Sequence, residues 1–228
     1  MTDSTLATHS DAAQEPRAFY DSLVEELHTL REAVSTEEKS FGGDQLMQGV
    51  ELYEWLKFQA WYEQQAAYFI GSWLQHTPED DAFIGLCQQV ADEGKHYKLL
   101  ISHLRSHGQT MEGWEPEPEW VDWVVDFYAS GDDTIERVAA HNITGELGAL
   151  QGFETLMPRI PEKTQRVLNK ILPDEKFHVQ LGRMVVERYA TTLDAQRRVR
   201  ERVLKAFELE QKGRIAFDRR MRQAMSAA

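Results

Sequence analysis

The amino-acid sequence predicts an all-α protein. No segment alternates apolar and polar residues in the regular way of a half-buried strand, whereas several long segments carry apolar residues at helical spacing. A five-residue motif, Asp-Glu-x-x-His, also occurs twice, at residues 92–96 and 174–178. Because residues three apart lie on the same face of a helix, each copy directs a carboxylate and an imidazole toward one point. The sequence therefore predicts helices that carry the two halves of one polar site.

Each copy of the motif has a glutamate upstream at nearly the same distance. Glu63 precedes Glu93 by 30 residues, and Glu146 precedes Glu175 by 29 residues. An internal repeat of a helix pair would produce this doubled spacing. Four helices would then supply four glutamates and two histidines as candidate metal ligands. The six candidates are Glu63, Glu93, His96, Glu146, Glu175 and His178.

This set of residues resembles that of the ferritin-like di-iron carboxylate superfamily, in which two helices each supply a Glu and two others each supply a Glu-x-x-His. The chain is more similar to the oxygen-activating members, such as bacterial multicomponent monooxygenases and the small subunit of ribonucleotide reductase. The likeness covers about residues 47–190. It implies a ferritin-like four-helix bundle with one long crossover, to which this chain adds N-terminal and C-terminal helices.

The resemblance also implies a role for each candidate. In the family pattern, the glutamates of the two Glu-x-x-His motifs bridge two metal ions, and each upstream glutamate completes one end together with a histidine. Here the bridging residues would be Glu93 and Glu175, and the ends would be Glu63 with His96 and Glu146 with His178. Asp92 and Asp174 match aspartates that hydrogen-bond a ligand histidine of the opposite helix and fix its orientation.

Other acidic residues do not fit the repeat. A third Glu-x-x-His, at Glu25 and His28, follows Val24 instead of an aspartate and has too little chain before it for a partner helix. We interpret it as an ordinary amphipathic surface. Three further glutamates lie at distances from the motifs that do not match, and we exclude them as ligands: Glu51, Glu54 and Glu154.

The chemistry of the candidates indicates a pair of divalent cations. Four carboxylates on apolar helix faces would repel one another unless they are neutralised. No Lys or Arg lies three, four or seven residues from Glu63 or Glu146, so the neutralising charge must come from elsewhere. Mixed carboxylate and imidazole ligands suit iron, with manganese as the alternative.

Small residues gather near the candidate ligands. They would either leave a cavity for dioxygen and a substrate or allow the helices to approach closely, and the sequence favours neither reading. They are Ala66, Ala67, Gly145, Gly148, Ala149, Gly152 and Gly182.

Composition is that of an ordinary globular protein. Of 228 residues, 42% are hydrophobic and 28% are charged. The single cysteine, Cys87, excludes an internal disulfide and an iron site with four cysteine ligands. No signal peptide and no long uncharged apolar run is present, so we expect a cytoplasmic protein without membrane contact. We expect residues 1–16 to be a disordered tail and residues 17–228 to form one domain.

Charge is distributed unevenly along the chain. The net charge is −13, yet residues 192–228 carry 10 Lys and Arg against 5 Asp and Glu, a local charge of +5. The acidic remainder disfavours nucleic acid as a partner. The basic segment would dock an acidic ferredoxin, an acyl-carrier or CoA-type substrate, or the acidic body of the same chain, and we favour the last because it requires no additional partner.

Helix boundaries follow from prolines, glycines and capping residues. We expect helices at about 17–33, at 44–75 with Glu63, and at about 78–107, the last with Thr77 as N-cap and Pro78 in its first position. A long connection with a short helix at 119–129 would follow. Asp132 or Asp133 would cap the helix of Glu146, which would end near Pro158.

Two more helices complete the expected fold. The first would run from Pro161 to Ala190, with Pro173 inside it causing a kink or a bulge two residues before Glu175. The bundle core would span about 44–190. The second would span about 192–224, with its apolar stripe formed by Val199, Val203, Ala206, Phe207 and Ile215.

The expected function is that of a non-haem dinuclear iron enzyme. It would use dioxygen and two electrons, from a ferredoxin or a reductase, to hydroxylate, epoxidise, N-oxygenate or desaturate a small organic substrate. A homodimer is compatible with this reading. The alternatives are a ferroxidase of a ferritin-like cage, a dimanganese catalase, and a helical interaction module that binds no metal. The wider fold group includes a tRNA hydroxylase, but the acidic body makes a polyanionic substrate a poor fit.

Overall fold

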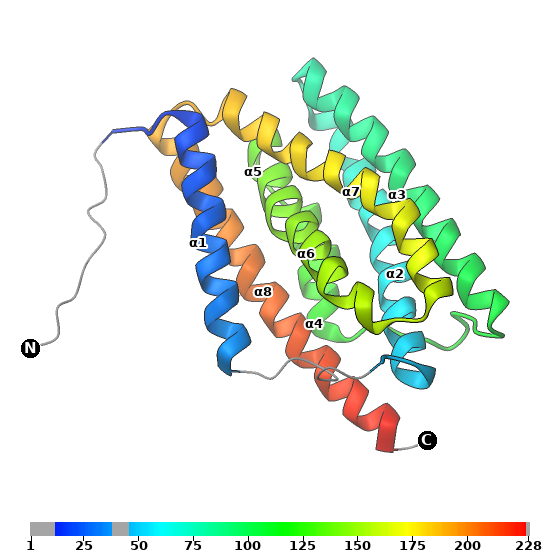
Figure 1. The fold of residues 1–228 in the computed structure, drawn as a ribbon. Helices are drawn as coiled ribbons and strands as arrows, with labels where there is room; N and C mark the ends of the chain where they lie inside the picture. Colours follow the sequence, from blue (N-terminus) through cyan, green and yellow to red (C-terminus); the bar gives the residue numbers. More distant parts are fainter. Residues whose placement is uncertain (1–11, 38–45, 227–228) are drawn as a thin grey trace, which may run out of the picture.

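A computed structural model describes residues 12–37 and 46–226, and within these ranges the chain is helical, without strands (Figure 1). Five long helices account for most of it: α1 (Pro16–Glu37), α2 (Gly49–Trp73), α3 (Asp80–Ser106), α7 (Glu162–Tyr189) and α8 (Leu193–Ser226). A further helical run comprises α5 (Thr134–Val138), the π-helix η3 (Ala139–Glu146) and α6 (Leu147–Leu156). Short elements are the 3-10 turns η1 (Leu74–His76) and η4 (Met157–Arg159), α4 (Pro118–Trp120) and the π-helix η2 (Val121–Phe127).

Four helical runs pack around the middle of the molecule. Along the colour gradient of Figure 1, α2 and α3 run in opposite directions, the α5–η3–α6 run has the direction of α3, and α7 returns. The connection after α3 therefore crosses from one end of the helices to the other.

The apolar core has two layers with a polar layer between them. One cluster contains Phe69 of α2, Leu86 of α3 and Leu181 of α7. The other contains Leu56 of α2 and Leu100 of α3, together with residues of α6 and α7. The candidate ligands lie between these two clusters along the same helices, so apolar side chains enclose them from both ends.

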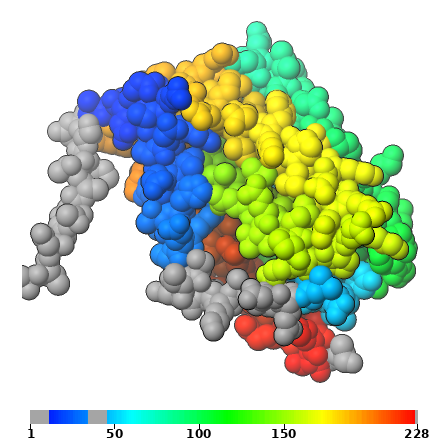
Figure 2. Space-filling model, viewed as in Figure 1, coloured from blue at the N-terminus to red at the C-terminus, as the bar shows by residue number. Residues whose placement is uncertain are grey.

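Helices α1 and α8 pack beside the four runs. Leu27 of α1, Ile143 of η3 and Val203 of α8 belong to a third buried cluster. Figure 2 shows α1 in blue and α7 in yellow on either side of the lime-green α6, with the red end of α8 below. The two additional helices thus extend the core on one side only.

The crossover is held by aromatic packing. The Trp120 ring lies 4.6 Å from the ring of Phe58, and its indole N–H donates a 2.8 Å hydrogen bond to the carbonyl of Gly213 in α8. The predicted short helix at 119–129 is confirmed, and its middle is the π-helix η2. The connection is therefore a packed part of the fold between α2 and α8.

The basic residues of α8 bind acidic residues of the same chain. Arg198 pairs with Asp133 and Glu136 of α5, and Arg200 pairs with Glu26 of α1. Two further arginines pair with Glu54, Glu117 and Glu119: they are Arg219 and Arg220. These pairs agree with the prediction that the basic segment docks on the acidic body of the same chain.

Of the two predicted helix N-caps, one is wrong and one is confirmed. The hydroxyl of Thr77 donates to the carbonyl of Trp73, at 3.0 Å, so Thr77 closes the turn after α2 and does not cap α3. Glu79 is the N-cap residue, and Pro78 precedes the helix. The cap assigned to Thr77 was wrong because its side chain faces the preceding helix. By contrast, Asp133 caps α5 as expected, since its carboxylate accepts a bond from the backbone N–H of Glu136.

Pro173 does not open a bulge. Helix α7 is α-helical from Glu162 to Tyr189, through this proline. Asn169, whose carbonyl loses its donor, and Pro173 itself are both exposed, so water can satisfy that carbonyl without an inserted residue. The π-helix near the site lies instead in the neighbouring run, as η3.

The ends of the predicted elements also differ. Gln14 exchanges two hydrogen bonds with Gln196 of α8, at 2.9 and 2.8 Å, and Pro16 begins α1, so the expected disordered tail does not extend to Pro16. Residues 1–11 lie outside the described part, as do residues 44 and 45, where the second helix was expected to begin.

Ile215 was predicted to belong to the apolar stripe of the last helix, but it is 50% exposed. It lies two residues, or about 200° of rotation, from the buried Gly213.

None of the helices in residues 12–37 and 46–226 combines the length and the apolar character that a membrane span requires.

The first testable prediction concerns the close approach of α7 and η3. A Cβ added at Gly182 would lie 2.7 Å from the Cβ of Asn142, which cannot move without its backbone. We expect Gly182→Ala to lower the free energy of unfolding by about 1–3 kcal/mol, measured by urea denaturation. The matched control is Gly71→Ala in α2, where an added Cβ meets nothing within 4 Å. We expect that variant to be stabilised by up to about 1 kcal/mol, and equal effects at both positions would contradict the packing argument.

Candidate metal centre

The structure brings all six sequence-predicted ligands together in the interior. Glu63 comes from α2, Glu93 and His96 from α3, Glu146 from the last position of η3, and Glu175 and His178 from α7. Each of the six side chains is at most 4% exposed. Six polar side chains from four helical runs thus share one buried layer.

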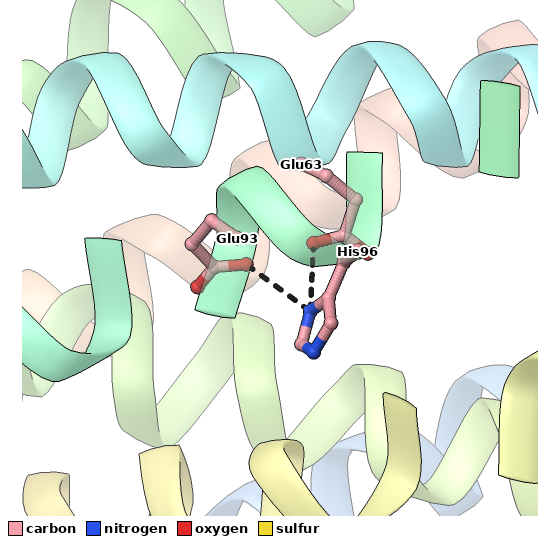
Figure 3. Close-up of side chains that lie close together, drawn as sticks. All are labelled: Glu63, Glu93 and His96. Atoms are coloured by element: carbon pink, nitrogen blue, oxygen red, sulfur yellow. Dashed lines mark ion pairs between the residues drawn. The ribbon is translucent and has the colours of Figure 1, made fainter. Parts of the chain in front are cut away.

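The first half of the centre surrounds the Nδ1 atom of His96. This nitrogen lies 3.4 Å from a carboxylate oxygen of Glu63, 3.6 Å from one of Glu93 and 3.2 Å from one of Glu175. Figure 3 shows the carboxylates of Glu63 and Glu93 directed at this nitrogen from two helices. The ligand atoms of Glu63, Glu93 and His96 all lie within 4.8 Å of one another, a spacing that could hold a metal ion.

The second half repeats this arrangement around the Nδ1 atom of His178. This nitrogen lies 3.2 Å from an oxygen of Glu175 and 3.6 Å from oxygens of both Glu93 and Glu146. The ligand atoms of Glu93, Glu146 and His178 form a second set within 4.8 Å. Two neighbouring positions could therefore hold metal ions.

Two glutamates face both positions, each with a different oxygen. Glu93 directs Oε2 toward His96 and Oε1 toward His178. Glu175 directs Oε1 toward His96 and Oε2 toward His178. A carboxylate that bridges two metal ions presents its oxygens in this way. Of these two imidazoles, Glu63 faces only His96 and Glu146 faces only His178.

The outer nitrogens of both imidazoles face the two predicted aspartates. His96 Nε2 lies 3.1 Å from Asp174 on α7, and His178 Nε2 lies 3.7 Å from Asp92 on α3. Each aspartate thus comes from the opposite helix, as the family pattern implies. Lys95 contacts both of them, and it is bonded to Asp174. A metal-binding histidine is commonly oriented by such a carboxylate on its other nitrogen.

Burial and mutual repulsion hold protons on the two outer glutamates. The pKa of Glu63 is raised well above its usual value by burial and by the charges of Glu93 and Glu175. Burial raises the pKa of Glu146 in the same way, with the charges of Glu175 and Glu93 adding to it. Without a cation, both outer carboxyls therefore keep their protons to a higher pH than an ordinary glutamate does.

The bridging glutamates and the two imidazoles behave in the opposite way. Burial alone would raise the pKa of Glu93 and Glu175, but the neighbouring imidazoles lower it for both. Burial opposes charge on the imidazoles, yet the carboxylates raise the pKa of His178 to about 11 and that of His96 further. Without cations, two imidazolium groups thus balance two carboxylates.

The donor set fits a pair of divalent cations. The Nδ1 atom of His96 is buried, points at three carboxylates and has no hydrogen-bond partner of good geometry. Two divalent cations would replace four protons, one each on Glu63, Glu146, His96 and His178, and the centre would stay neutral. Oxygen and imidazole ligands in this mixture suit iron or manganese.

Sequence reasoning missed one amide that supports the centre. Gln89 is fully buried, and its amide donates to Glu146 at 2.7 Å and to Glu93 at 3.2 Å. Asn142 in turn donates to the side-chain oxygen of Gln89 and to the carbonyl of His178, both at 2.9 Å. The sequence does carry a signal for this residue, because Gln89 is a polar side chain on an apolar helix face, one turn before Glu93.

The structure keeps the excluded residues away from the centre. His28 of the third Glu-x-x-His contacts Gln151 at 3.1 Å and reaches none of the six. Glu54 binds Lys57, Trp114 and Arg220. Three of the seven small residues serve close packing: an added Cβ would lie 2.6 Å from the Tyr62 hydroxyl at Gly145, 2.7 Å from Arg31 at Gly148 and 2.7 Å from Asn142 at Gly182. At Gly152 an added Cβ would meet nothing within 4 Å.

In comparisons with known proteins, no family, no curated protein and no solved structure matched the sequence. The functional argument therefore rests on the geometry of the six side chains and on the chemistry that they permit.

The second prediction concerns protons that leave when metal binds. We expect two equivalents of Mn²⁺ or Zn²⁺ to release about four protons at neutral pH, since ligands must be deprotonated to bind. The bound state holds fewer protons, so metal affinity should rise with pH, and for His178 the rise should continue toward its pKa of about 11. Calorimetry in buffers of different ionisation enthalpy measures the released protons. Binding without proton release would contradict the assigned protonation.

The third prediction concerns the aspartates behind the histidines. We expect Asp92→Ala and Asp174→Ala each to weaken the binding of one metal equivalent by about 10–100-fold, because the imidazole loses its orienting partner. Asp194→Asn is the matched control, since Asp194 pairs only with Arg198 on the surface. Unchanged affinity in both alanine variants would show that the aspartates do not act on the centre.

Proposed function

We propose that this chain is a dinuclear non-haem iron enzyme of the ferritin-like, oxygen-activating kind, which uses O2 and two electrons to oxidise a small organic substrate. The observation that carries the proposal is the pair Glu93 and Glu175, each of which presents one oxygen to each of two imidazoles. Two outer glutamates and two crossed aspartates complete the pattern that the superfamily uses.

The arrangement of the helices supports the ferritin-like assignment. The four runs that supply ligands are two antiparallel pairs joined by one long crossover, the connectivity expected of that bundle (Figure 1). Each pair contributes one Glu and one Glu-x-x-His. A bundle alone would say nothing about chemistry, so the proposal depends on the ligands more than on the fold.

The bound metals would supply the redox chemistry with O2. The chain itself supplies six ligand side chains, excludes water by enclosing them between two apolar clusters, and orients the imidazoles through Asp92 and Asp174. Gln89 holds the Oε1 atom of Glu146. Six protein ligands for two ions leave coordination positions open for O2.

The proposed electron donor and substrate are those that this class of reaction requires. Two electrons from a ferredoxin or a reductase would return the centre to its reduced state, and the oxidation would be a hydroxylation, epoxidation, N-oxygenation or desaturation. The pairing of α8 with acidic residues of its own chain reduces the need for an acidic partner at that helix. A homodimer remains compatible with the proposal.

The fourth prediction tests the proposal directly. Protein purified from iron-supplemented cells should contain about two irons per chain, and its near-ultraviolet absorption should change when the reduced protein meets O2. We expect Glu93→Ala and His178→Ala to lose both the iron and the optical change. His28→Ala removes the histidine of the unused Glu-x-x-His and should keep both.

Other outcomes would select a different function. Rapid disproportionation of hydrogen peroxide with two bound manganese ions would favour a catalase, and a cage-sized particle in light scattering would favour iron storage. Folded protein that binds no stoichiometric metal, without having met a chelator, would leave only a helical interaction module.

A further inference from the structure

A third imidazole lies behind the centre, on one side only. His141 is fully buried in η3, and its Nδ1 atom lies 3.5 Å from Oε1 of Glu146. His141 is not one of the six ligands predicted from the sequence. The same oxygen of Glu146 accepts the 2.7 Å hydrogen bond from Gln89.

The π-helix brings His141 to Glu146. In an α-helix, residues five apart are separated by about 140° of rotation, so their side chains diverge. A π-helix closes its hydrogen bonds between residues five apart, which places those residues next to each other. His141 and Glu146 are five apart, and both lie within the π-helical Ala139–Glu146. A search at α-helical spacings therefore could not find this pair.

Among the six candidate ligands, Glu146 is the one that the structure pairs with a ring nitrogen of His141. Four aromatic rings enclose the imidazole, with ring centroids 4.9 to 6.2 Å away: Phe69, Tyr128, Tyr62 and Trp73. In the described part of the chain, neither ring nitrogen has a hydrogen-bond partner of good geometry. A buried donor without a partner is costly, so a small movement of Glu146 toward Nδ1 would be favourable. Burial also lowers the pKa of His141 to about 4, and the ring is neutral.

The other half of the centre has no counterpart. Five residues before Glu63 stands Phe58, which packs against Trp120 at 4.6 Å. Glu63 contacts His96 of the centre, at 3.4 Å, and within residues 12–37 and 46–226 no amide donates to it as Gln89 donates to Glu146. One outer glutamate therefore has a hydrogen bond from Gln89 and a nearby imidazole behind it, while the other has neither.

We infer that His141, together with Gln89, makes the two metal positions unequal. His141 is a positioning residue for Glu146, so the position between Glu146 and His178 binds its metal more tightly and fills first. This inference rests on the proposed dinuclear centre and specifies its order of loading.

Stepwise metal titration tests the inference. Apo-protein is titrated with Mn²⁺ and with Co²⁺ by calorimetry and by the Co²⁺ absorption spectrum, and wild type should show two resolved steps. We expect His141→Phe, which keeps the aromatic packing, to weaken the tighter step by about 10–100-fold and to leave the other step unchanged. His141→Gln keeps an N–H donor and should recover most of the affinity.

Two controls identify the affected step. Asp174→Ala should weaken the looser step, because Asp174 orients His96. His103→Gln removes another buried histidine. His103 lies farther along α3 and hydrogen-bonds to Thr164, so this variant should change neither step. An unchanged tighter step in His141→Phe, or an equal loss in both steps, would overturn the inference while wild type still binds two metals. Wild type that binds fewer than two equivalents would overturn the proposed function as well.

Discussion

Four carboxylates and two imidazoles share one buried layer, and the rest of the molecule is arranged around the need to neutralise them. Buried carboxylates at this spacing cannot all be ionised without cations, because desolvation and mutual repulsion both oppose it. In the absence of metal, burial and repulsion raise the pKa of both outer glutamates, and the carboxylates raise the pKa of the His178 imidazole. Two divalent cations would satisfy the same balance with all four carboxylates ionised.

The scaffold serves this layer at several distances. Apolar clusters close it above and below, and Asp92 and Asp174 fix the imidazoles from outside. The contact of Gly182 with Asn142 lets α7 and η3 approach closely enough for Asn142 to donate to the carbonyl of His178. Helices α1 and α8 add apolar cover on one side, and the arginines of α8 are occupied by acidic residues of the chain.

The sequence predicted the ligands more fully than their setting. Paired motifs and their spacing were sufficient for Glu93, His96, Glu175 and His178, since helical periodicity is regular over one turn. Local hydrogen-bond choices were not predictable: Thr77 bonds backward to Trp73, and α7 passes Pro173 without a bulge. The π-helix η3 depends on tertiary packing, and it alone places His141, so a sequence search at α-helical spacing missed that residue.

Anomalous scattering from crystals of the iron- or manganese-loaded protein would test the central claim most directly. The account predicts two peaks in the buried layer. One would lie against Glu63 and His96, the other against Glu146 and His178, and Glu93 and Glu175 would contact both. A single peak, or peaks only at surface carboxylates while the six side chains keep their protons, would contradict a dinuclear centre.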